Sequence, residues 1–272
     1  MIDSSGMRWN VHVAGDGPDL LLVHGTGSSL ATWRGLLPAL AEDFRVVAVD
    51  LPGHGGTDPL PRGQASITAM ANALARCRAT LGSFPAAAVG HSAGAALLLR
   101  MTLDRQIDPR HIVAINPALM PYGGRRAHLF APLARALAAA PVLPWLIARR
   151  AADPRAVDRM IRGTGSVLAA DGIATYQRLF ADEGHVRSTL DMMAGWDLGT
   201  LVDELGPIAA RVHLVVGTAD MAVPPSQSRA LRSRYPAMRR VSLRGAGHLA
   251  HEERPAEVAA LIRSAVLDDV LQ

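Results

Sequence analysis

A serine flanked by glycines is the most informative feature of this sequence. The motif GHSAG, residues 90–94, follows the short apolar run Ala86–Gly90 and precedes the helical pattern Ala93–Leu103. A sharp turn from strand to helix needs small residues on both sides of the serine, because the backbone there passes close to its neighbours. Such a turn lifts a hydroxyl above the end of a sheet, at the N-terminus of a helix. Ser92 is therefore the predicted nucleophile of an acyl-transfer reaction.

A histidine and an acid are expected to activate this serine, because a hydroxyl is a weak nucleophile until a base takes its proton. Asp220 follows the apolar run Val212–Gly217, and His248 follows the last apolar run of the chain. The order Ser92, Asp220, His248 suits a triad in which the carboxylate holds the imidazole in its productive tautomer. These three residues are the predicted catalytic set.

Each of the two supporting residues has a competitor. Asn116 ends the preceding strand, which is another common place for the acid, but its side chain carries no charge. His251 competes as the base, but it lies about one turn into the following segment, whereas His248 stands in a glycine-rich loop. Asp220 and His248 are therefore favoured.

A stabilised oxyanion needs two hydrogen-bond donors that are already in place. The amide of Ala93, the residue after the nucleophile, is the first predicted donor. The second is expected in the motif HGTG, residues 24–27, which ends an earlier strand. The amide of Thr26 is preferred there, with Gly27 as the alternative, and His24 is interpreted as structural.

Residue types that are absent exclude other chemistries. The chain contains no lysine, which rules out a Walker A loop, a Schiff base and a Ser-Lys dyad. Its single cysteine, Cys77, lies on the apolar face of a helical pattern and is predicted to be core. The segment 25–30 with Asp50 imitates a dinucleotide fingerprint but lacks the third glycine. His248 and His251 have no third histidine nearby, so neither a cofactor nor a metal is predicted.

Apolar runs alternate with helical patterns along most of the chain. Strands are predicted over residues 19–24, 44–50, 86–90, 111–116, 212–217 and 240–243. Helices are predicted over residues 33–41, 66–81, 93–103, 226–235 and 255–267. Continuous apolar strands alternating with helices indicate an α/β fold, with a doubly wound and mostly parallel sheet.

Residues 117–205 interrupt this alternation, since they contain helical patches and no convincing strand. The predicted organisation is a core of residues 1–116 and 206–272, with residues 117–205 forming an all-helical cap inserted after the sixth strand. Large apolar side chains of this segment are either packing residues of the cap or the lining of a substrate pocket. They are Phe130, Leu133, Trp145, Met192, Met193 and Trp196, of which the last four are the predicted substrate-binding residues.

Overall charge is nearly balanced, with 28 basic and 24 acidic residues, so a nucleic-acid partner is not predicted. The N-terminus lacks an apolar core followed by a cleavage site, and no signal peptide is expected. The most apolar long stretch, Leu129–Ala148, contains an arginine and three prolines and is not expected to span a membrane. The expected location is the cytoplasm.

The motifs HGTG, DLPGHGGTD, GHSAG, GTADMAVPP and GHLAHEERP, in this order, resemble the α/β-hydrolase superfamily. The resemblance covers nearly the whole chain outside the predicted cap. It implies an α/β-hydrolase fold and a serine hydrolase of the carboxylesterase type. The nucleophile position holds Ser92 and not the aspartate of haloalkane dehalogenases and epoxide hydrolases, which disfavours those activities.

The segments RMTLD, LFAPLAR, RAADP, GTGS and MMAGWDL resemble one subfamily, the BchO-type magnesium-chelatase accessory proteins of bacteriochlorophyll biosynthesis. This resemblance implies a role near magnesium insertion into a porphyrin. Arginines of the cap suit the porphyrin carboxylates, or are solvated helix ends; they are Arg125, Arg126, Arg149 and Arg150.

Two functions follow from these resemblances. One is hydrolysis of an ester or similar acyl bond in a small apolar substrate. The other is a non-catalytic assistant that binds a tetrapyrrole or the magnesium-chelatase subunits through the cap.

Overall fold

The computed structural model describes residues 1–120, 140 and 142–267. Strands of these residues form two sheets. The small antiparallel sheet consists of β1 (Ile2–Ser4) and β2 (Met7–Trp9). The strands of the large sheet are β3 (Val11–Ala14), β4 (Asp19–Val23), β5 (Arg45–Val49), β6 (Ala87–His91), β7 (His111–Ile115), β8 (Arg211–Gly217) and β9 (Arg239–Leu243).

The order in the large sheet is β3-β5-β4-β6-β7-β8-β9. Only the pair β3/β5 is antiparallel, and the other neighbours run parallel. This confirms the predicted α/β class with a mostly parallel sheet. The antiparallel edge strand and the small sheet were not predicted, because their strands of three or four residues are too short to show a clear pattern.

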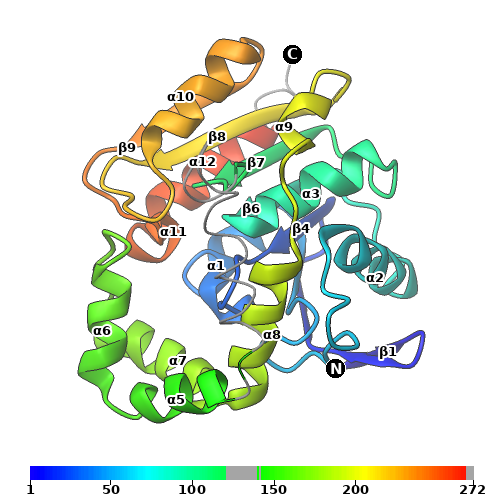
Figure 1. Ribbon diagram of the computed structural model, residues 1–272. Helices are drawn as coiled ribbons and strands as arrows, with labels where there is room; N and C mark the ends of the chain where they lie inside the picture. Colours follow the sequence, from blue (N-terminus) through cyan, green and yellow to red (C-terminus); the bar gives the residue numbers. More distant parts are fainter. Residues whose placement is uncertain (121–139, 141, 268–272) are drawn as a thin grey trace.

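Helices cover both faces of the large sheet (Figure 1). The core helices are η1 (Leu30–Trp33, a 3-10 helix), α1 (Leu37–Leu40), α2 (Ile67–Thr80), α3 (Ala93–Leu103), α10 (Pro225–Arg234), α11 (Ala250–Glu253) and α12 (Pro255–Leu267). The single helix predicted over residues 33–41 is wrong, since η1 and α1 are separate. Gly35 between them passes so close to Pro255 that a Cβ at Gly35 would lie 2.8 Å from the proline Cβ. A side chain at this position would therefore not fit.

Alternate residues of the parallel strands enter two hydrophobic clusters, one on each face. Leu21 and Val23 pack with α2 and α3, whereas Leu20 and Leu22 pack with α1 and α12. Both strand faces are therefore buried, which is why these strands read as continuous apolar runs. Cys77 belongs to the first cluster, as predicted, and burial raises the pKa of its thiol to about 12.

The segment predicted as a cap lies between β7 and β8, after the seventh strand of the described chain. Its described part contains α5 (Val142–Ala151), α6 (Pro154–Arg162), α7 (Ala170–Ala181), α8 (Glu183–Gly195) and α9 (Leu201–Glu204), and no strand. Helices α5, α6 and α7 gather beyond one end of the sheet, and α8 leads back to the core (Figure 1). Phe130, Leu133, Arg125 and Arg126 lie outside the described residues. Among the helices that are described, none is long and apolar enough to cross a membrane.

Candidate active site

Ser92 stands alone between β6 and α3 in a backbone conformation that non-glycine residues rarely adopt. Its φ is 51° and its ψ is −116°. A Cβ at Gly90 would lie 2.5 Å from the amide nitrogen of Ala95, and one at Gly94 would lie 2.2 Å from the carbonyl oxygen of Val23. Both glycines are therefore required by close backbone approach, which is the physical basis of the GHSAG pattern. The turn places Ser92 at the N-terminus of α3.

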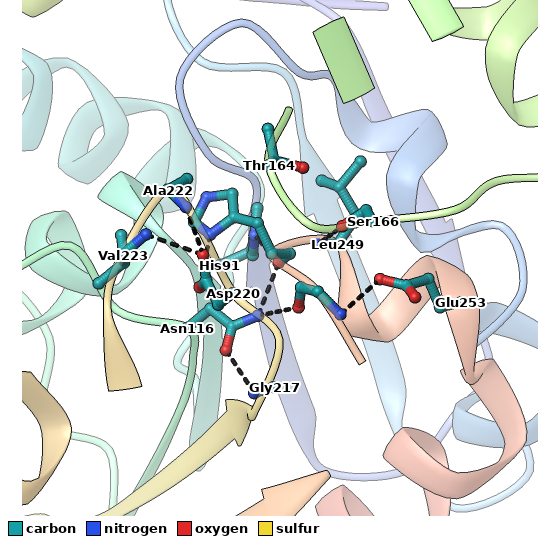
Figure 2. Close-up of polar contacts among 12 residues, drawn as sticks. His91, Asn116, Thr164, Ser166, Gly217, Asp220, Ala222, Val223, Leu249 and Glu253 are labelled. Atoms are coloured by element: carbon teal, nitrogen blue, oxygen red, sulfur yellow. Dashed lines mark hydrogen bonds and ion pairs between the residues drawn. The ribbon is translucent and has the colours of Figure 1, made fainter. Parts of the chain in front are cut away.

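Asp220 and His248 form a buried pair. Their side chains meet through Nδ1 of His248 and Oδ2 of Asp220 at 2.8 Å. The other carboxylate oxygen accepts hydrogen bonds from the amides of Ala222 and Val223, each at 2.8 Å (Figure 2). Because an ionised carboxylate only accepts, the proton on this side of the ring sits on Nδ1, which leaves Nε2 as the basic nitrogen.

The loop that carries His248 lies beside Ser92, because it contacts the residue that precedes the serine. His91 directly precedes Ser92, and its Nε2 donates to the carbonyl oxygen of His248 at 2.9 Å. The rings of His91 and His248 pack with centroids 4.7 Å apart. The structure therefore brings the predicted nucleophile, base and acid to the carboxyl ends of β6, β8 and β9.

Asn116 is a positioning residue that the sequence did not reveal. Its Nδ2 donates to the carbonyl oxygens of Gly247 and His248 at 2.9 and 2.7 Å, and its Oδ1 accepts from the amide of Gly217 at 2.7 Å (Figure 2). A carboxylate here could not donate to the two carbonyls. The position thus requires an amide that clamps the histidine loop to the end of β8. Its place at a strand end before Pro117 was the only signal.

We expect Asn116→Ala to lower both stability and turnover. The change leaves buried carbonyl and amide groups unpaired, at about 1–3 kcal/mol each. It also frees the His248 loop, and small misplacements of a catalytic group cost up to roughly 100-fold in rate. Thermal unfolding and ester-hydrolysis kinetics measure the two effects. Asn72→Ala is the control, because Asn72 is exposed and only accepts from Gln106. An unchanged melting temperature and kcat in Asn116→Ala would contradict the clamp.

The HGTG segment forms a tight turn against the serine. The amide of Ser28 donates to the carbonyl of Gly25 at 3.2 Å, and Gly27 has a φ of +72°. A Cβ at Gly25 would lie 3.0 Å from the Cβ of Ser92, so this loop passes close to the serine side chain. Ala93 is the first residue of α3, so its amide has no acceptor within the helix. The two predicted oxyanion donors, Thr26 and Ala93, therefore belong to two segments that both lie next to Ser92.

His24, interpreted as structural, and His251, the competing base, are both engaged elsewhere. His24 donates from Nδ1 to the carbonyl of Gly25, and its Nε2 accepts from the amide of Leu51. The Nε2 of His251 lies 2.6 Å from the hydroxyl of Thr32, and burial lowers the pKa of His251 to about 3. Within the part of the chain that is described, no group of three or more metal-ligating side chains is placed to hold a metal ion.

Buried neutral histidines should make the fold sensitive to acid. Burial lowers the pKa of His54, His91 and His251, in the last case to about 3. In the unfolded chain each titrates near pH ~6.5. Below that pH the unfolded chain therefore binds protons that the folded chain does not, and stability falls as the pH falls. Each histidine contributes about 1.4 kcal/mol per pH unit, or about 4 kcal/mol for the three.

Circular dichroism melting curves from pH 7.5 to 4.5 measure this effect. The melting temperature should drop steadily below pH ~6.5. His12→Gln, a change at an exposed histidine, is the matched control. Equal melting temperatures at pH 7 and pH 5 would contradict the prediction.

The four predicted substrate-binding residues lie in different surroundings. Met192 is buried, and its sulfur accepts from the hydroxyl of Thr26 at 3.6 Å, beside the serine. Met193, the next residue, is 58% exposed. Trp196 packs against the core cluster of α2 and α3. Trp145 is 44% exposed on α5, where the guanidinium of Arg149 stacks on its ring. Of these four residues, Met192 is therefore the one with a hydrogen bond to the loops around Ser92 in the described structure.

The cap segment between α6 and α7 also fastens the catalytic loops. The carbonyl of Thr164 accepts from the amides of His248 and Met221, at 3.3 and 3.0 Å. The hydroxyl of Ser166 accepts from the amide of Leu249 at 2.8 Å (Figure 2). The loops that carry Asp220 and His248 are thus held by the cap as well as by the sheet.

A parallel sheet with a serine on a strand-to-helix turn, and an acid–histidine pair at neighbouring strand ends, defines a class of protein. The chain belongs to the alpha/beta hydrolase family, whose model matches residues 20–261. It is 40% identical to the "Magnesium-chelatase 30 kDa subunit" of Rhodobacter capsulatus, over 87% of this chain and 82% of the relative. It is 27% identical to the "Pimeloyl-[acyl-carrier protein] methyl ester esterase" of Aeromonas hydrophila, over 94% and 98% of the two chains.

Solved structures agree with this assignment. An alpha/beta hydrolase fold protein from Burkholderia ambifaria superimposes with a TM-score of 0.78 at 25% identity, over 98% of both chains. A thermophilic esterase from Thermogutta terrifontis superimposes with a TM-score of 0.76 at 22% identity, over 95% of this chain and 92% of the other. The latter similarity concerns the fold.

Proposed function

We propose that this protein is a serine hydrolase that cleaves an ester or similar acyl bond of a small apolar substrate. The observation that carries the proposal is the buried Asp220–His248 pair, held beside the turn of Ser92. One carboxylate oxygen of Asp220 accepts hydrogen bonds from two backbone amides, and the other accepts from the imidazole of His248. The side chain is thereby fixed in the orientation that orients the histidine. The curated esterase relative supports the same reaction class, that of carboxylic ester hydrolases.

The geometry supports a two-step reaction. Nε2 of His248 takes the proton of Ser92 as the hydroxyl oxygen attacks the acyl carbon, and Asp220 stabilises the imidazolium that forms. The amides of Thr26 and Ala93 bind the oxyanion. The imidazolium then protonates the leaving group as the acyl–oxygen bond breaks. Water, deprotonated by the same histidine, hydrolyses the acyl-enzyme and restores Ser92.

Covalent labelling tests this function directly. A fluorophosphonate should add to the Ser92 oxygen with loss of fluoride, and mass spectrometry of the peptide containing residues 90–94 should locate the adduct. Asp220→Asn should label far more slowly. A chain that stays unlabelled at Ser92, or that is labelled elsewhere, would overturn the proposal.

A second candidate rests on the relative that is 40% identical over most of both chains. In this second candidate function, the protein acts in the cytoplasm as an accessory of magnesium chelatase, and it binds a tetrapyrrole or the chelatase subunits. The two candidates are compatible, because the pathway role can require the hydrolase reaction. A host in which the gene is deleted should accumulate metal-free porphyrin, and complementation separates the candidates. Rescue by Ser92→Ala supports a binding role, whereas failure at normal protein level supports catalysis. We favour the catalytic outcome.

A further inference from the structure

Side chains of the cap contact the loop of residues 24–28, which carries the predicted oxyanion donor Thr26 and is called the oxyanion loop below. Three consecutive residues of the loop, 26–28, each contact a different cap side chain. The contacts are Thr26 Oγ1 to Met192 Sδ at 3.6 Å, His185 Nε2 to the carbonyl oxygen of Gly27 at 3.2 Å, and Ser28 Oγ to Tyr176 Oη at 3.2 Å. A Cβ at Gly27 would lie 3.2 Å from the ring of Phe180 in α7 and 3.4 Å from Thr189 in α8. The cap thus covers this turn at van der Waals distance.

Tyr176 connects the loop to a buried carboxylate. Its hydroxyl donates to Oε1 of Glu252 at 2.7 Å, and the hydroxyl of Thr32 donates to the same oxygen at 2.6 Å. Since the tyrosine proton points to Glu252, the hydroxyl of Ser28 must donate to Tyr176. The chain of hydrogen bonds therefore runs in one direction, from Ser28 through Tyr176 to Glu252. Burial raises the pKa of both Tyr176 and Glu252.

His185 connects the loop to a second core segment. Its Nδ1 accepts from the amide of Gly55 at 3.2 Å, so its proton is on Nε2, which donates to the carbonyl of Gly27. Burial lowers the pKa of His185, which favours this neutral, singly protonated ring. One imidazole of the cap helix α8 therefore sets the orientation of the peptide group that follows Gly27.

We propose that Tyr176 and His185 are positioning residues that hold the oxyanion loop in its catalytic conformation, so that the cap completes the oxyanion hole. The proposal rests on the hydrolase function proposed above. An oxyanion hole works because its donors are fixed before the charge develops. A turn built on two glycines has little conformational preference of its own. Besides the turn's own hydrogen bond from the Ser28 amide to Gly25, the hydrogen bonds to the Gly27 carbonyl and the Ser28 hydroxyl come from these two cap side chains. The cap is then part of the catalytic machinery as well as a cover for the substrate.

Single variants separate this role from simple packing. Tyr176→Phe keeps the ring and removes the hydroxyl, and His185→Leu removes both ring hydrogen bonds. Each should lower kcat for a p-nitrophenyl ester by about 10- to 100-fold and leave KM within about twofold, because the ester carbonyl needs the hole mainly in the transition state. The affinity for a boronic acid, which forms a tetrahedral adduct on Ser92, should fall in parallel with kcat. A merely structural role would not link these two quantities.

Two further variants serve as controls. His185→Gln keeps a donor near the Nε2 position and should restore most of the loss seen in His185→Leu. Tyr235→Phe removes a tyrosine hydroxyl that donates to the carbonyl of Val202, away from the loop, and should leave kcat and boronate affinity unchanged. If Tyr176→Phe does not fold, Ser28→Ala breaks the same contact from the loop side.

Folded variants with unchanged kcat and boronate affinity would overturn the positioning role, while fluorophosphonate labelling of Ser92 in the native chain keeps the hydrolase proposal intact. Absence of labelling in the native chain would overturn both.

Discussion

Replacing Ser92 by alanine should lower kcat for a short p-nitrophenyl ester by about 10⁴- to 10⁶-fold, as loss of the nucleophile does in serine triads. The hydroxyl oxygen is the only non-hydrogen atom that the change removes. The backbone of the turn is held by the close approach of Gly90 and Gly94 to neighbouring backbone and by the amide of Ser92, which donates to the carbonyl of Ile115. The melting temperature should therefore stay within a few degrees of that of the native protein.

Esterase assays and thermal unfolding on the same preparation test this expectation. Ser226→Ala is a suitable control, because Ser226 is an exposed serine of α10, away from the turn. It should keep full activity. Native-like turnover in Ser92→Ala would place the reaction at another residue and would remove the basis of the catalytic proposal.

Ser92→Gly should abolish activity to the same extent but increase stability. A serine at a φ of 51° and a ψ of −116° is strained, and such strain costs on the order of 1–3 kcal/mol, which glycine avoids. Part of the gain is offset by the larger entropy of glycine in the unfolded chain. Urea unfolding of Ser92→Gly and Ser92→Ala measures the difference. A glycine variant less stable than the alanine variant would contradict the idea that the turn stores strain.

Asp220→Asn should lower kcat by about 10⁴-fold, the second largest effect expected. One end of the new amide still accepts from Ala222 and Val223, so its NH₂ group faces Nδ1 of His248 and forces the proton onto Nε2. The histidine then has the wrong tautomer to take the proton of Ser92. The imidazolium also loses its stabilising charge.

The matched control is Asp197→Asn in the cap. The carboxylate of Asp197 is exposed and accepts a hydrogen bond from the neighbouring amide of Gly199 at 2.8 Å, so this change should leave kcat within about twofold. Kinetics with saturating ester compare the two variants. A nearly silent Asp220→Asn beside an inactive Asp197→Asn would show that the acid had been assigned to the wrong residue.

Sequence patterns were reliable where short-range geometry controls the structure. The buried parallel strands read as apolar runs because both of their faces lie in the core, as the two clusters around β4 show. The turn of Ser92 could be located because Gly90 and Gly94 are required by backbone approach. The helix predicted over residues 33–41 was wrong, because residues 34–36 form a turn between η1 and α1.

The sequence by itself determined the fold class, and it predicted Ser92, Asp220 and His248 as the catalytic set, since buried strands and the GHSAG turn depend on residue types close together in the chain. Only the tertiary structure decided how these parts are held. In the sequence, Asn116 occupies a position where the catalytic acid is often found but carries no charge. In the structure it clamps the His248 loop to the end of β8, because β7 and β8 are neighbours in the sheet. Tyr176 and His185 look like ordinary helix residues, yet the cap places both on the oxyanion loop about 150 residues away. Local sequence patterns cannot reveal such contacts. The long-range partner of a side chain depends on how the helices pack, and such a contact produces no regular spacing of residue types in the sequence.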